Sequence, residues 1–127
     1  MTAEDRGLVL VTARMLEAAM KVDLLTTGLT LIATASLLVA SPHRIEAIVA
    51  IALGLAAKFY AVRIAFDARL LDDIATGSLF SSDLDTAFPT KAGRSWDARC
   101  RGARRLVVVF VVLVVAQCVS LGAALLV

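Results

Sequence analysis

The sequence predicts an all-α membrane protein in which three transmembrane helices form an antiparallel bundle. Hydrophobic residues make up 60% of the 127 residues, whereas an ordinary soluble domain is about 45–50% apolar. The mean hydropathy is +0.87, and the basic residues are concentrated on one side of the predicted spans. One domain is expected at this length, so residues 1–127 are interpreted as a single membrane domain.

Residues 1–21 are predicted to form a cytoplasmic amphipathic helix. Thr2 is a suitable N-cap, and Glu4 and Asp5 place acids near the positive helix end. The apolar residues that recur at helical spacing are Leu8, Val11, Met15, Ala18 and Val22. This helix either lies on the membrane surface or continues into the first span, and the pattern leaves both possibilities open.

The first and third spans are predicted from the length of their apolar runs, because about 20 helical residues cross a bilayer core. Residues 22–41 contain one charged residue, Asp23, and end at the polar turn Ser41–Arg44. Residues 106–127 contain no charged residue and directly follow Arg104 and Arg105.

The second span, residues 45–65, is less regular, since Lys58 ends an uncharged run of 11 residues, Ala47–Ala57. Pairing depths across the turn places Lys58 near Thr27 and Arg63 near Asp23. We therefore expect Asp23 to pair with Lys58, Arg63 or both. Ionisable residues at membrane depth face protein and indicate function, so this group is a structural ion pair, a transport or proton-relay site, or a lipid headgroup site. A re-entrant hairpin is the alternative to a span.

Small and polar residues recur along the spans. They are Thr26, Thr30 and Thr34 in the first, Ala50, Gly54, Ala57 and Ala61 in the second, and Gln117, Ser120 and Ala124 in the third. Such residues allow close helix packing and bonds between helices. A packed three-helix core explains the pattern, as does a pore in which Thr30, Thr34 and Gln117 face water between subunits.

Residues 66–105 are predicted to form a cytoplasmic helical extension, a loop and a basic helix. Gly77 is a natural C-cap for the extension, and Ser95 can cap the last helix. That helix begins with Trp96 and carries four arginines, which are Arg99, Arg101, Arg104 and Arg105. We expect Trp96 and these arginines to set the topology and to contact anionic lipids or a protein partner.

Orientation follows from the Lys and Arg residues that flank the spans. Ten lie before the first span or after the second, whereas the turn between those spans has only Arg44. The positive-inside rule then places the N-terminus in the cytoplasm and the C-terminus outside. We expect a bacterial inner membrane.

Composition argues against several classes of function. His43 is the single histidine, and the thiols of Cys100 and Cys118 are expected to be unpaired. We therefore predict no metal site and no cofactor. The net charge of +2 is too small to imply a nucleic-acid partner. The expected partners are the bilayer, with its anionic lipids, and another copy of the chain or a second membrane protein.

The topology resembles that of the small prokaryotic diacylglycerol kinases, whose second span carries the motif Glu-x-x-Asn-[Ser/Thr]-Ala-x-Glu. The corresponding residues here, Ala57–Ile64, include no glutamate or asparagine, so no catalytic residue is carried over. The leading hypothesis is a non-enzymatic membrane protein that acts by helix–helix association, as an accessory subunit or homo-oligomer. The alternatives are a homo-oligomeric channel or transporter using Asp23, Lys58 and Gln117, and a lipid-handling enzyme.

Overall fold

The described part of the chain contains helices and no strands. The structure is a computed structural model that describes residues 1–39, 42 and 44–126. Its long helices are α1 (Ala3–Leu38), α2 (Arg44–Ala75) and α4 (Trp96–Leu126), with the short α3 (Ser81–Ala87) and the 3-10 helix η1 (Pro89–Lys91) between α2 and α4. The predicted all-α class is confirmed. Ser41 and His43 of the predicted turn, residues 40–41 of the predicted first span and the last residue of the predicted third span lie outside the described residues.

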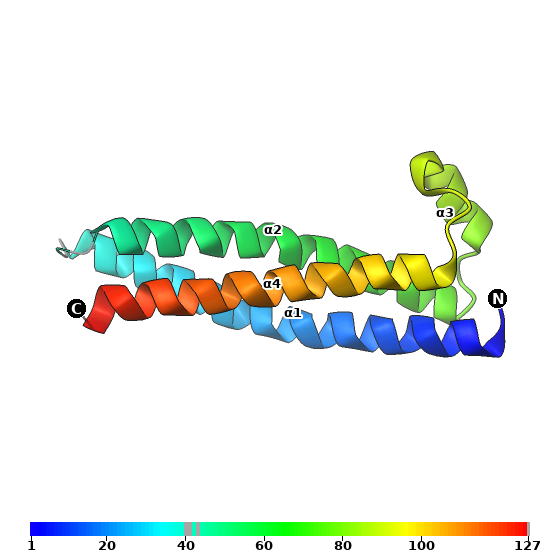
Figure 1. Ribbon diagram of the computed structural model, residues 1–127, viewed down its shortest axis with the longest axis horizontal. Helices are drawn as coiled ribbons and strands as arrows, with labels where there is room; N and C mark the ends of the chain where they lie inside the picture. The colour runs from blue at the N-terminus through cyan, green and yellow to red at the C-terminus, as the bar shows by residue number, and fades with distance from the viewer. Residues whose placement is uncertain (40–41, 43, 127) are drawn as a thin grey trace.

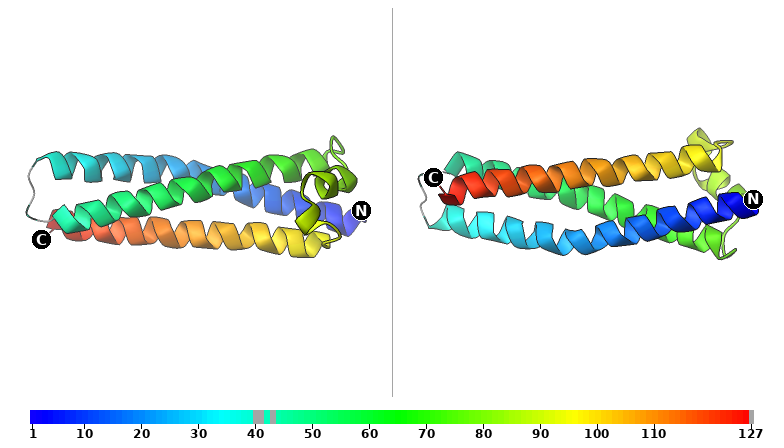
Figure 2. Two further views of the ribbon diagram at one scale, coloured as in Figure 1. Left: turned by 90° about the horizontal axis from the view of Figure 1, so that it is seen from above. Right: turned by 60° about the horizontal axis from the view of Figure 1, so that its bottom comes forward.

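The three long helices lie side by side as a bundle (Figures 1 and 2). α2 runs antiparallel to α1 and α4, and the N-terminus and α3 lie at the same end, which we call the α3 end (Figure 1). At 1.5 Å per residue, the 36 residues of α1 span about 54 Å and the 31 residues of α4 about 46 Å. Each helix is thus longer than a bilayer core of about 30 Å.

The helix ends are fixed by local hydrogen bonds. Thr2 and Asp5 form a reciprocal capping box in which the Asp5 N–H donates to Thr2 Oγ1 at 3.1 Å and the Thr2 N–H donates to Asp5 Oδ2 at 3.0 Å. The bonds from the Thr2 backbone and side chain lower the pKa of Asp5. At the start of α4, Ser95 Oγ accepts from the Ala98 N–H at 3.3 Å. Gly77, just beyond α2, has φ +80°. All three predicted caps are confirmed.

The N-terminal segment continues into the rest of α1 without a break. Its buried face was predicted only in part, since Leu8 and Val22 of the predicted stripe pack against the core but are partly buried. Val9, Ala13 and Leu16 are buried, whereas Val11 is 68% exposed. Between Gly7 and Met20 only Arg14 and Glu17 are charged, so periodicity does not define one face. Ala13 and Ala19 let α1 approach its neighbours closely, and the contact therefore lies one position away from the predicted stripe.

Small residues line the contacts of α2, as predicted. Ala50, Gly54, Ala57 and Ala61 are all buried. Phe110 of α4 is the largest fully buried side chain and belongs to the same core cluster as Ala57 and Ala61. Close helix approach at alanine and glycine, with one bulky side chain filling the space between, is the packing expected of helices in lipid.

Two helices, α2 and α4, are long and apolar enough to cross a membrane. Only 28% and 22% of their most apolar segments are buried within the protein, whereas a core helix of a soluble protein is mostly buried. Large apolar side chains such as Phe59 and Val119 are 71% and 67% exposed. α1 is not one of these two helices. Its second half includes Lys21, Asp23 and a series of threonines, and the first predicted span remains a prediction.

Candidate functional site

Lys58 of α2 reaches across the bundle to α1. Its Nζ donates to Asp23 Oδ2 at 2.5 Å and to Thr27 Oγ1 at 2.7 Å. The side chains are 44% and 27% exposed for Lys58 and Asp23, so the pair lies at the edge of the α1–α2 contact. Lys58 and Arg63 were the two predicted partners of Asp23, and Lys58 is the one that contacts it. The side chain of Arg63 turns along its own helix, with Nε 3.9 Å from Asp67 Oδ1.

A second polar contact joins α1 and α4. Gln117 is fully buried, and its Nε2 donates to Thr30 Oγ1 at 2.9 Å. Gly54 of α2 faces the same bond, because a Cβ added there would overlap Thr30 Oγ1 and lie 2.6 Å from Gln117 Nε2. All three long helices therefore meet at one level. We call Thr30, Gly54 and Gln117 the polar layer.

The threonine stripe of α1 does not form one exposed polar face. Thr26 is buried and Thr34 is exposed. The Thr30 hydroxyl donates to Thr26 O and the Thr34 hydroxyl to Thr30 O, both at 2.8 Å. These hydroxyls are therefore bonded to the carbonyl one turn earlier on their own helix.

Two buried acceptors in this region have no hydrogen-bond partner among the described residues. They are Asp23 Oδ1 and Gln117 Oε1. A cavity of about 200 Å³ is lined by Lys58, which bonds Asp23, and by Thr30, which bonds Gln117. Each unpaired buried acceptor lowers the free energy of unfolding by about 1–3 kcal/mol. The polar contacts of Asp23 and Gln117 are therefore not optimised for stability alone.

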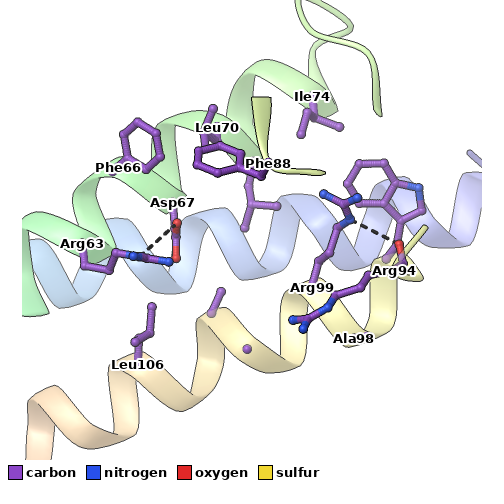
Figure 3. Close-up of a pocket in the computed structure, with 14 residues that line it drawn as sticks. Arg63, Phe66, Asp67, Leu70, Ile74, Phe88, Arg94, Ala98, Arg99 and Leu106 are labelled. Carbon is purple, nitrogen blue, oxygen red and sulfur yellow. Dashed lines mark hydrogen bonds and ion pairs between the residues drawn. The ribbon is translucent and has the colours of Figure 1, made fainter. Parts of the chain in front are cut away.

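A larger cavity, of about 340 Å³, lies between α2 and α4 at the α3 end. Figure 3 shows Arg63 and Asp67 at one end of it and Arg94 and Arg99 at the other. Its apolar walls include Phe66, Leu70, Ile74, Phe88 and Leu106. We call it the α3-end cavity. Its volume is within the usual range for ligand pockets, about 300–1,000 Å³.

Arg99 is held in place within this cavity by several groups. Its Nη2 donates to Asp85 Oδ1 at 2.5 Å and its Nε to Arg94 O at 3.2 Å (Figure 3 shows the second bond). Its guanidinium carbon lies 5.6 Å from the centre of the Trp96 ring, within the range of a cation–π contact. The side chain is only 15% exposed. Arg99 is therefore a positioned cation.

The five residues predicted to contact lipid or a partner separate into two groups. Trp96 and Arg99 line the cavity. Arg101, which bonds Asp97 one turn earlier on α4, is exposed, as are Arg104 and Arg105.

Sequence reasoning missed the contributions of Arg63, Arg94 and Phe88 to this cavity. Arg94 directly follows Gly93, whose φ of +73° marks a turn into α4. The sequence Gly93-Arg94 directly before Ser95, the N-cap of α4, was the signal from which the position of Arg94 could have been predicted. Phe88 comes from the connection before η1 and meets Phe66 of α2 edge to face, with ring centroids 6.5 Å apart. Nothing in its local sequence indicates this contact.

The fold and these two sites define an all-helical protein with two helices that could cross a membrane. The chain matches no protein-family model, no curated protein and no solved structure.

Proposed function

We propose that the protein is a three-span inner-membrane bundle that acts by helix–helix association, as an accessory subunit or a homo-oligomer. In this topology α1, α2 and α4 all cross the bilayer, the α3 end is cytoplasmic and the C-terminus lies outside. The excess of basic residues at the α3 end supports the orientation. The apolar, exposed sides of α2 and α4 support insertion.

The single observation that carries the proposal is the inward bonding of the membrane-depth polar groups. Lys58 bonds Asp23 and Thr27, and Gln117 bonds Thr30, all within one chain. Lysine and aspartate at membrane depth require protein partners, and here α1 supplies the partners for α2 and α4. This pairing favours insertion of α1 with the other two helices. The outer apolar faces then remain free to meet lipid or other membrane helices.

A channel or transporter is the second candidate, and the two unpaired acceptors favour it. Asp23 Oδ1 and Gln117 Oε1 are without partners among the described residues, and the side chains that bond these two residues, Lys58 and Thr30, line a cavity. A transport path, however, needs these groups to meet water from both sides. Lys58 and the Gln117 Nε2 instead bond side chains of α1, as in a packed helix contact, so we rank this candidate below helix association.

The topology is tested by cysteine labelling in a variant whose two native cysteines are replaced by alanine. A cysteine at the exposed position Arg44 should react only with a reagent added from outside, and one at Arg6 only from the cytoplasmic side. Labelling of Arg44→Cys from the cytoplasm would overturn the orientation.

The mode of action is tested by crosslinking in native membranes, followed by purification and mass measurement in nanodiscs. We expect a defined homo-oligomer or a stoichiometric membrane partner. Ion flux in liposomes that contain the protein alone, abolished by both Lys58→Ala and Gln117→Ala but kept in Thr34→Ala, would instead support the channel.

A further inference from the structure

We infer that the α3-end cavity binds the headgroup of an anionic phospholipid from the cytoplasmic leaflet. The inference rests on the membrane topology proposed above, but not on the proposed role in helix association. It is carried by three arginines and a tryptophan that line a cavity with otherwise largely apolar walls.

The cavity lies at the boundary between the basic first part of α4 and its apolar second part. Arg105 is the last charged residue of that helix, and Leu106 begins the uncharged run. The lining residues Gly102, Ala103 and Leu106 come from both sides of this boundary. In the proposed topology the cavity is therefore at the level of lipid headgroups, where Trp96 is also a favourable residue.

The charge of the lining favours an anion. Arg63, Arg94 and Arg99 line the cavity with a single acid, Asp67. Asp85, from outside the lining, bonds Arg99 and holds it in place. Arginine binds phosphate with paired N–H donors, and basic pockets between membrane helices on the cytoplasmic side bind anionic headgroups.

The walls favour a lipid over free phosphate. Phe66 and Leu106 continue the cavity towards the apolar part of the bundle, and Phe66 is 50% exposed. In our proposal the lipid phosphate lies at the Arg94 and Arg99 end. Arg63, at the other end (Figure 3), donates to the ester carbonyls of the lipid, whose acyl chains follow the outside of the bundle into the bilayer.

Trp96 is the only tryptophan of the chain and lines the cavity, so its fluorescence reports occupancy. The full chain is reconstituted in phosphatidylcholine vesicles with increasing amounts of phosphatidylglycerol brominated near the ester end of its acyl chains. We expect saturable quenching at a lower mole fraction than with brominated phosphatidylcholine. Arg94→Gln and Arg63→Gln should each raise the half-quenching mole fraction about fivefold, from ~1 kcal/mol per basic residue near the surface.

Arg104→Gln is the matched control, because Arg104 is exposed on the same basic helix outside the cavity lining. It should shift the midpoint by less than twofold. Equal quenching by the two brominated lipids, or an equal shift in Arg104→Gln and Arg94→Gln, overturns the inference and leaves membrane insertion intact. Reversal of quenching by inorganic phosphate assigns the site to a free anion and overturns the lipid. Quenching by neither lipid overturns the proposed topology itself.

Discussion

Gln117 on α4 donates a 2.9 Å hydrogen bond to Thr30 on α1, 87 residues earlier in the chain. Gly54 on α2 faces this bond without a side chain, and any Cβ there would overlap it. The polar layer thus combines the three features that bring membrane helices together, which are a small residue, a hydroxyl and an amide.

Gly54→Ala should destabilise the bundle by about 1–3 kcal/mol, because the methyl group would force Thr30 and Gln117 apart. Unfolding in mixed micelles with increasing denaturing detergent measures this change. Gly122→Ala on α4 is the control, since a Cβ there meets no atom within 4 Å. It should be neutral or stabilising by up to about 1 kcal/mol. Equal destabilisation by both substitutions would contradict the close approach at Gly54.

Gln117→Leu should change the unfolding free energy by less than about 1 kcal/mol. The substitution loses one hydrogen bond, but it also removes Gln117 Oε1, a buried acceptor without a partner. Gln117→Ala should cost about 2–3 kcal/mol more than Gln117→Leu, because it leaves a cavity in the core. The same detergent titration compares them. A large loss in Gln117→Leu would show that the amide does more than the single bond to Thr30.

Lys58→Met should destabilise the protein by about 1–3 kcal/mol, because it leaves the partly buried Asp23 carboxylate without its cation. Asp23→Asn in the same background should recover part of that loss, since a neutral amide needs no counter-charge. The two changes form a double-mutant cycle, and a coupling of at least about 0.5 kcal/mol is expected. Additive effects would indicate that the pair contributes nothing beyond its separate members.

The first turn of α1 should loosen in acid. The Thr2 bonds lower the pKa of Asp5, so the carboxylate's contribution to the cap is fully present above its ordinary pKa of about 3.9. It is lost as the pH falls through the lowered pKa. Cα chemical shifts of residues 3–8, measured in micelles between neutral pH and acid, report the change. Thr2→Ala should weaken this pH dependence without removing it, because alanine keeps the backbone N–H that bonds Asp5. A first turn that stays equally helical throughout would contradict the cap.

The sequence predicted the helices well because their signals are local. Thr2, Gly77 and Ser95 each fix a helix end through atoms a few residues away. The small residues of α2 also predicted its buried face, since close approach in lipid depends on side-chain size. The prediction of the buried face of the N-terminal segment failed at Val11 and Ala18, because residues 7–20 are mostly apolar and offer several faces of similar hydropathy. Only its neighbours decide which one is covered.

The candidate sites were predictable to different degrees. Depth counting across one turn placed Lys58 near Thr27, and Lys58 indeed bonds both Thr27 and Asp23. The same counting could not decide that Arg63 would turn to Asp67, because that depends on rotamers. The α3-end cavity depends on the path of residues 78–95, whose contacts join Phe88 to Phe66 and Asp85 to Arg99. Such contacts of irregular chain leave no periodic signal in a single sequence.

The ion pair between Asp23 and Lys58 has a consequence for the biosynthesis of the protein. The two residues are 35 positions apart, so each of α1 and α2 carries one charge whose partner in this ion pair lies on the other helix. On the proposed topology, neither helix partitions favourably into lipid by itself at that depth, and the two enter the bilayer together as a hairpin at the insertion machinery. The part of α4 that follows Arg105 contains no charged side chain, so α4 can insert into the bilayer later and without a partner helix. The order of synthesis thus matches the order in which the membrane can accept the helices.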